Sequence, residues 1–196
     1  MYAWRLPFTL NINGKDYKIR TDYRVILDII AAMNDKDIFS GNETEEEKEE
    51  IKAFTMLDIL FPDVDSIPDA DLNEAIEKAC EFIDCGIKGD STPRPRTMDW
   101  KQDAPLIVAG VNKVAGVDVR QKDYLHWWSF MAMYMEIGES TFSTVLSIRD
   151  KKRKGKLEKW EREYYKQNKN LIELEADKFK RSKEEQEELD KLFGRK

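Results

Sequence analysis

One set of side chains in the sequence could carry out acid–base chemistry: Asp123, His126 and Ser129, at successive spacings of three. In a helix this spacing places a carboxylate, an imidazole and a hydroxyl along one face. Nucleophilic catalysis also needs an independently oriented nucleophile and donors for an oxyanion, and the neighbouring sequence supplies neither. We therefore interpret the three residues as a polar stripe beside a buried face, and we expect no catalytic residue.

Other signatures of catalysis or metal binding are missing from the sequence, which has no phosphate-binding loop, dinucleotide fingerprint, nucleophile elbow or zinc spacing. Cys80 and Cys85 are five residues apart in an expected helix, which turns their side chains about 140° from each other. That geometry favours neither a disulfide nor a metal pair. We expect a protein that is not an enzyme and has no metal or cofactor.

The most concentrated basic segment is 149–156, which has six Lys or Arg in eight residues. It could bind phosphate, with the aromatic residues just beyond it stacking on single-stranded nucleic acid. The alternatives are a solvated helix end, which is the favoured interpretation, and a docking surface for an acidic protein. Glutamates follow the run at once and the chain has a net charge of −6, and both features argue against nucleic acid as the partner. The candidate partner-binding residues here are Lys151, Lys152, Arg153, Lys154 and Lys156.

Charge is distributed unevenly along the chain. Residues 1–90 hold 10 Lys or Arg against 21 Asp or Glu, a net charge of −11, and residues 91–196 carry +5. Opposite charges of this kind favour contacts between subunits or with a second protein, so we expect self-association. The acidic candidates for such contacts are Glu45, Glu46 and Glu47. The apolar candidates, sparsely placed in the charged C-terminal tail, are Leu189, Leu192 and Phe193.

The pattern of apolar residues predicts a mainly α protein that begins with a β-hairpin. Asn13-Gly14 between two β-type runs is a strong hairpin signal, because both turn positions need a positive φ. Thr21 is the expected cap of a helix over 22–34, and Thr44 with Glu47 forms a capping box for a helix that ends near residue 60. Helical periodicity over the rest of the chain brings the expected total to about six or seven helices in a bundle.

The segment 124–137 is predicted to be the central helix of that bundle. It contains two of the five tryptophans and is apolar around most of its circumference. At roughly 20 Å it is too short to cross a bilayer, and we expect no membrane association. Trp128 is expected to be buried in this helix.

We expect four segments along the chain. Residues 1–90 contain the hairpin and acidic helices, 91–97 form a linker, 98–172 form a helical region, and 173–196 are a charged tail that a partner could order.

Four motifs of the second half resemble a known family when they occur in this order: Asp99-Trp100-Lys101-Gln102-Asp103, Gly110-Val111-Asn112-Lys113-Val114, His126-Trp127-Trp128-Ser129-Phe130 and Arg149-Asp150-Lys151-Lys152. The chain resembles the phage "gene product fifteen" family of tailed phages and prophages of Gram-positive bacteria. Similarity is clear over about 98–172 and looser over 1–90. The signature and core residues are Trp100, Asn112, His126, Trp127, Trp128 and Phe130.

The resemblance implies a place in the tail-morphogenesis module, near the major tail and tape-measure proteins. Tail assembly chaperones of that neighbourhood are helical and keep the tape measure soluble. The resemblance transfers no catalytic residue. It leads us to expect a chaperone in the host bacterial cytoplasm; the alternatives are a structural tail component retained in the virion, or a phage protein that binds nucleic acid or a host factor.

Overall fold

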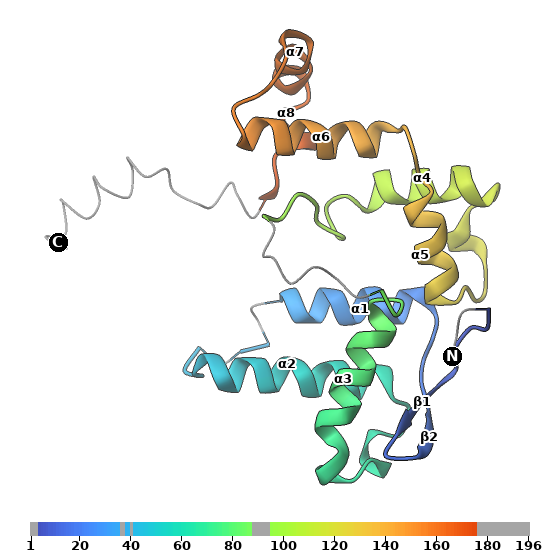
Figure 1. Cartoon of the computed structure of the whole chain (residues 1–196). Coiled ribbons are helices and arrows are strands. Elements are labelled where there is room, and N and C mark those ends of the chain that lie inside the picture. Colours follow the sequence, from blue (N-terminus) through green and yellow to red (C-terminus); the bar gives the residue numbers. More distant parts are fainter. Residues whose placement is uncertain (1–3, 36–37, 40, 88–94, 176–196) are drawn as a thin grey trace, which may run out of the picture. The chain divides into compact units, whose positions relative to one another are not determined.

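The computed structural model describes residues 4–35, 38–39, 41–87 and 95–175 (Figure 1). Over these residues the fold is mainly α with an N-terminal β-hairpin, which confirms the predicted fold class. The strands are β1 (Thr9–Ile12) and β2 (Lys15–Lys18). The α-helices are α1 (Tyr23–Asn34), α2 (Glu45–Leu60), α3 (Leu72–Ile83), α4 (Ala104–Ala115), α5 (Trp127–Met135), α6 (Thr141–Arg153), α7 (Lys159–Gln167) and α8 (Lys169–Ile172).

The hairpin forms where the turn signal predicts it. Asn13 and Gly14 have φ values of 47° and 80°, and Ile12 faces Lys15 across the turn. The first strand begins at Thr9, two residues beyond Pro7, because proline cannot donate a backbone hydrogen bond to a ladder. Leu10 and Tyr17 form a facing pair that is buried on the inner side of the hairpin.

Helix starts are set by local side chains. The capping box of Thr44 and Glu47 is present at α2. At α1 the cap is Asp22, one residue later than expected, and its carboxylate accepts a hydrogen bond from the backbone N–H of Arg24. Ser140 and Ser143 form a second capping box at the start of α6. These bonds satisfy amide groups that have no partner within the helix.

The segment predicted as one long helix over 124–137 differs from the prediction. Its helix, α5, is nine residues long and begins at Trp127. Trp127 and Phe130 are buried, whereas Trp128 is half-buried and Met135 is 57% exposed. The helix therefore buries one face only, and the expectation that Trp128 lies fully in the core was wrong.

The chain divides into two compact units. The first comprises residues 1–94 and 107–138, and the second comprises 95–106 and 139–196. This division runs through the region predicted as one helical segment over 98–172, because α4 begins in the second unit and continues into the first.

The first unit is built on the hairpin and helices α1, α2, α3 and α5. Helix α2 packs along α1, and α3 packs beside β1 (Figure 1). The aromatic core includes Tyr23 of α1, whose ring stacks on Phe130 with centroids 4.6 Å apart. Ile26 and Leu57, from α1 and α2, are fully buried.

The second unit has a smaller core, formed by Val145 and Ile148 of α6 and Ile172 of α8. Leu106, Tyr164 and other partly buried side chains pack around it. No helix among the described residues is long and apolar enough to cross a membrane.

Gly110 of α4 marks a close packing point within the first unit. A Cβ atom added there would lie 2.7 Å from Cγ2 of Ile137. Overpacking of this kind costs about 1–3 kcal/mol, against a gain of up to about 1 kcal/mol from the higher helix propensity of alanine.

We expect Gly110→Ala to lower the free energy of unfolding, measured by urea denaturation, by about 1–2 kcal/mol, because the clash outweighs the propensity gain. The matched control is the same substitution in an Ile137→Ala background, where the clashing atoms are gone and Gly110→Ala should be neutral or stabilising. Equal effects in the two backgrounds would contradict the close contact.

Candidate functional site

Arg149 of α6 organises the second unit, although the sequence presented it only as part of a basic run. Its side chain is 6% exposed and forms a two-pronged ion pair with Asp103. Nη1 lies 2.6 Å from Oδ2 and Nη2 lies 2.8 Å from Oδ1. Burial strengthens the attraction between the two charges but also removes their hydration, so removing one partner leaves the other uncompensated and is costly.

The same guanidinium also donates to three backbone carbonyls. Nε binds the carbonyl of Ile172 at 2.5 Å, and Nη2 binds that of Leu171 at 3.1 Å, both at the end of α8. Nη1 binds the carbonyl of Thr97, in the segment before α4, at 3.1 Å. All five N–H groups of Arg149 are therefore in use, so the residue can position its surroundings but has no donor left for a ligand.

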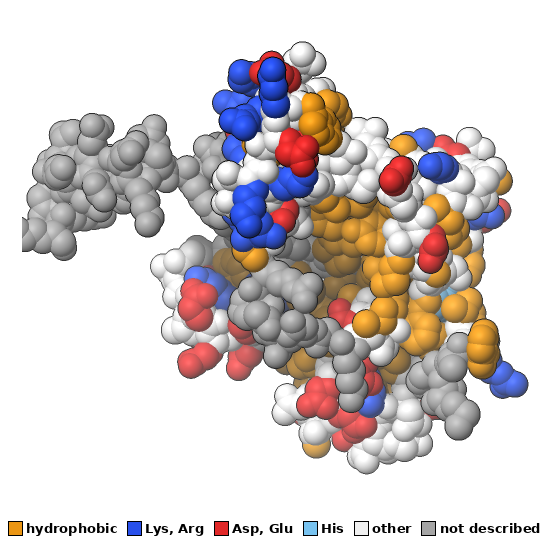
Figure 2. Space-filling model, turned by 45° about the horizontal axis from the view of Figure 1, so that its top comes forward, with side chains coloured by type: hydrophobic (Ala, Val, Ile, Leu, Met, Phe, Trp, Pro, Cys, Tyr) orange, Lys and Arg blue, Asp and Glu red, His pale blue; other side chains and the backbone are white. Residues whose placement is uncertain are grey.

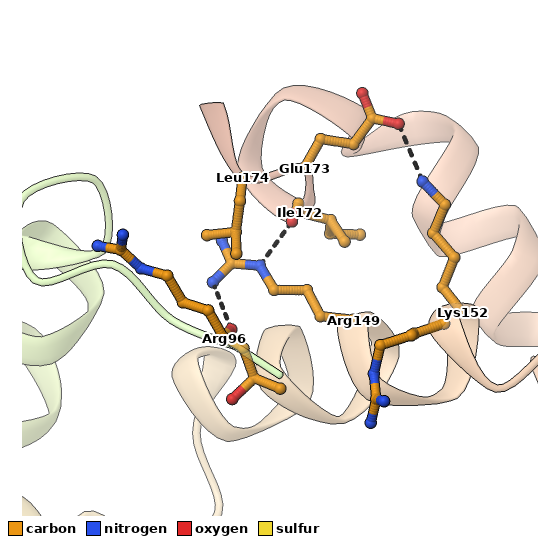
Figure 3. A pocket seen from close by; sticks show the side chains of 8 residues that line it. Arg96, Arg149, Lys152, Ile172, Glu173 and Leu174 are labelled. Carbon is orange, nitrogen blue, oxygen red and sulfur yellow. Dashed lines mark hydrogen bonds and ion pairs between the residues drawn. The ribbon is translucent and has the colours of Figure 1, made fainter. Parts of the chain in front are cut away.

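A pocket of about 490 Å³ opens beside this arginine (Figure 3). Ile172 and Leu174 supply apolar lining, and Arg96, Lys152, Arg153 and Glu173 supply charged groups. Figure 3 shows Lys152 directed toward Glu173, and the two are 3.0 Å apart. The pocket combines an apolar floor with an excess of positive charge, an arrangement that suits an apolar side chain next to a carboxylate.

Two guanidinium groups on the pocket wall keep spare donors. Arg96 donates to Asp99 and to the carbonyl of Met98, and Arg153 donates to Asp150. Each side chain is almost half exposed, and within the described part of the chain these bonds leave further N–H groups of both residues unoccupied. Arg96 had no place among the candidates from the sequence, because it lies next to Pro95 in the expected linker, far from the basic run 149–156.

Most of the predicted basic run is neutralised within the second unit. Lys151 lies 2.6 Å from Glu161, and Arg153 and Lys154 share Asp150. Lys156 is exposed and has no ion pair within the described ranges. Figure 2 accordingly shows Lys and Arg side chains interspersed with Asp and Glu over the α6–α7 region. The structure thus gives little support to a continuous cationic surface of the kind that binds nucleic acid.

These pairs shift the pKa values of their members in the directions that attraction predicts. The hydrogen bond from Lys151 lowers the pKa of Glu161, and the same bond raises the pKa of Lys151. Burial works against the charge of Lys152, yet its hydrogen bonds to Tyr165 and Glu173 raise its pKa. The charges therefore remain fixed in pairs through neutral pH.

The acidic candidates lie in the first turn of α2, apart from any pocket described for the first unit. Glu45 pairs with Lys48 at 2.7 Å, and the Glu47 carboxylate accepts the backbone N–H of Thr44. Glu46 is exposed. Leu189, Leu192 and Phe193 lie outside the described residues.

The signature residues have identifiable structural roles. The indole N–H groups of Trp127 and Trp128 donate to the carbonyls of Ile83 and Phe82 at the end of α3, each at 2.8 Å. Asn112 accepts the backbone N–H of Val119. Trp100, in the second unit, is half-buried.

His126 is the N-cap of α5 and is 2% exposed. Its Nδ1 accepts the backbone N–H of Trp128 at 3.0 Å, so the proton is on Nε2, which donates to the carbonyl of Pro7 at 2.9 Å. Both ring nitrogens are engaged with the backbone. Asp123 precedes the helix, so Asp123, His126 and Ser129 do not lie on one helix face as expected from the sequence.

The chain matches the family model described as Bacteriophage Gp15 protein over residues 4–174. The chain belongs to this family. The match confirms the resemblance drawn from the four motifs and extends it through the N-terminal hairpin. No curated protein matches the chain, and no solved structure does.

Replacing Arg149 of this Gp15 family member should destabilise the second unit. Arg149→Lys leaves Asp103 and three carbonyls without most of their donors, and breaking a buried ion pair costs about 3–5 kcal/mol. Urea denaturation followed by circular dichroism measures the loss. Arg153→Lys is the matched control on the exposed side of the same helix and should change the unfolding free energy by less than about 0.5 kcal/mol. Similar losses of unfolding free energy in the two variants would contradict the stabilising role of the buried Arg149 side chain.

Burial lowers the pKa of His126, although the hydrogen bond to Pro7 partly opposes the shift. Because the unfolded chain takes up this proton at a higher pH than the folded chain, the contribution of neutral His126 to stability is complete above its ordinary pKa of about 6.5 and is lost as the pH falls below it. The loss is at most about 1.4 kcal/mol per pH unit.

Urea denaturation between pH 7.5 and 5.5 should therefore show a steeper loss of stability in the wild type than in His126→Asn. Asparagine can still cap α5 and does not titrate. Parallel pH profiles for the two proteins would show that His126 titrates normally in the folded chain.

Proposed function

We propose that this protein is a non-enzymatic tail assembly protein, a chaperone that binds the tape-measure protein during tail morphogenesis in the host cytoplasm. Membership of a phage family establishes only the broader statement, that this is a phage protein. The observation that carries the proposal is the pocket beside Arg149. Its polar groups are held in place by internal hydrogen bonds and its floor is apolar. These features suit the binding of a polypeptide segment better than the catalysis of a group-transfer reaction.

The pocket also suggests what part of a client it takes. Ile172 and Leu174 can cover an apolar side chain, while the spare N–H groups of Arg96 and Arg153 can bind a carboxylate next to it. An amphipathic client helix with Leu or Phe beside Glu or Asp presents this combination at i and i+4 spacing. A long helical tape-measure protein offers many such positions.

Pairing of charge within the second unit makes the site selective. Lys151 and Lys152 are held by Glu161 and Glu173, so they attract an incoming anion less than free lysines would. Binding then depends on the guanidinium groups of Arg96 and Arg153 and on apolar contact. This combination favours a protein segment that carries both an apolar and an acidic side chain over a uniformly charged polymer.

Co-expression with the tape-measure protein of the same phage tests the proposal. The tape measure should move into the soluble fraction and elute with this protein on gel filtration. An Arg96→Glu/Arg153→Glu variant should weaken the complex about tenfold or more, because it reverses the charges that face the client carboxylate. The matched control is Arg162→Glu on the exposed side of α7, outside the pocket.

Mass spectrometry of purified particles separates a chaperone from a structural component, since a chaperone should be missing from mature tails. A fixed number of copies per virion would make the protein a tail component. An insoluble tape measure and no complex on gel filtration would refute the binding proposal.

A further inference from the structure

A groove of about 290 Å³ in the first unit lies between the hairpin and α3. Leu10, Phe82 and Trp128 form its apolar lining. The Phe82 and Trp128 rings stack with centroids 6.1 Å apart, and the Trp128 indole is held by its bond to the Phe82 carbonyl. The floor is therefore rigid as well as apolar.

One wall of this groove is the free edge of β1. The backbone N–H of Ile19 donates to the carbonyl of Phe8, which makes these two residues a hydrogen-bonded pair. Hydrogen-bonded pairs alternate along an antiparallel ladder, so the backbone groups of Thr9 and Asn11 point away from β2. Within the described ranges, no hydrogen bond reaches these outward groups.

The groove runs along this edge and not over one face of the sheet. Leu10 and Asn11 are neighbours in a strand, so their side chains point to opposite faces. Both residues line the groove. Contact with both neighbours is what a space along the strand's edge would make, and an additional strand would pair at that edge.

The opposite wall, from α3, is acidic. Glu74 and Glu81 line the groove with one lysine, Lys78, which lies 2.9 Å from Glu81. Within the part of the chain that the structure describes, the Glu74 carboxylate accepts one hydrogen bond, from the neutral backbone N–H of Asn13. The hydrogen bond to Glu81 raises the pKa of Lys78, and the charge of Glu74 raises it further. One lysine thus faces two carboxylates, and the wall keeps a net negative charge.

We propose that this groove binds an extended, basic segment of a partner protein as a third strand next to β1. The backbone of Thr9 and Asn11 supplies the ladder hydrogen bonds. A large apolar side chain of the segment packs on Phe82 and Trp128, and flanking Lys or Arg residues pair with Glu74 and Glu81. The site shares no residue with the pocket beside Arg149, so a test of this groove does not depend on whether the proposed function is correct.

The probe is a fluorescein-labelled nine-residue peptide with Lys at every even position, Trp in the centre and Val at the other odd positions. Fluorescence anisotropy with the full chain should show saturable binding that weakens as salt rises. Glu81→Lys should weaken binding roughly tenfold. The matched control is Glu77→Lys, the same change at an exposed position of α3 outside the groove, and it should have a much smaller effect.

Two peptide variants test the strand geometry. N-methylation at one alternate set of residues should abolish binding and at the other set should leave it unchanged, because only one set donates to β1. The backbone amide signals of Thr9 and Asn11 should shift in nuclear magnetic resonance spectra on binding of the unmodified peptide.

Three results would overturn the proposal. They are no saturable binding up to about 1 mM peptide, equal effects of Glu81→Lys and Glu77→Lys, or equal binding of both methylated peptides. Self-association of the chain that Glu81→Lys abolishes would assign the groove to a second copy and would also overturn it.

Discussion

The buried ion pair between Arg149 and Asp103 is the interaction on which the second unit depends. The unit has a small apolar core, and its last helix, α8, is only four residues long. So short a helix cannot satisfy its own terminal carbonyls. Arg149 supplies the missing donors and is itself held in place by Asp103. The five N–H groups of Arg149 thus hold both the end of α8 and the carboxylate of Asp103 in place.

The first unit uses the same principle with different residues. Nη1 of Arg20 donates to the carbonyls of Asp58, Ile59 and Phe61, at the end of α2. Trp127 and Trp128 do the same at the end of α3. In each case a side chain distant in the sequence satisfies carbonyls that helix geometry leaves without a partner. The short helices of this protein are therefore stabilised largely by tertiary contacts.

This use of polar side chains limits where function can lie. Arg149, His126 and the paired lysines of α6 are all engaged within the fold, so the charge density of the sequence overstates what is available to a partner. The accessible features are the two guanidinium groups beside the apolar pocket and the free edge of β1 beside its acidic wall. We propose an acidic polypeptide segment as the partner of the first surface and a basic one as the partner of the second.

The sequence alone determined the features that depend on neighbouring residues. Asn13-Gly14 specified the hairpin turn because few residues tolerate positive φ, and Thr44 with Glu47 specified the start of α2 because the cap and its partner are three residues apart. The four motifs determined the family in the same way, as short patterns in a fixed order.

Only the tertiary structure decided the rest of the site. Nothing in a basic run distinguishes Arg149, which is buried, from Arg153, which is exposed, because their difference depends on Asp103 and on α8, far away in the sequence. Likewise the neighbouring Trp127 and Trp128 are buried and half-buried, because their burial depends on contacts with segments such as the end of α3, which lie far from them in the sequence. Local patterns fix where elements begin; long-range contacts determine which of their faces are covered, and those contacts cannot be inferred from spacing along the chain.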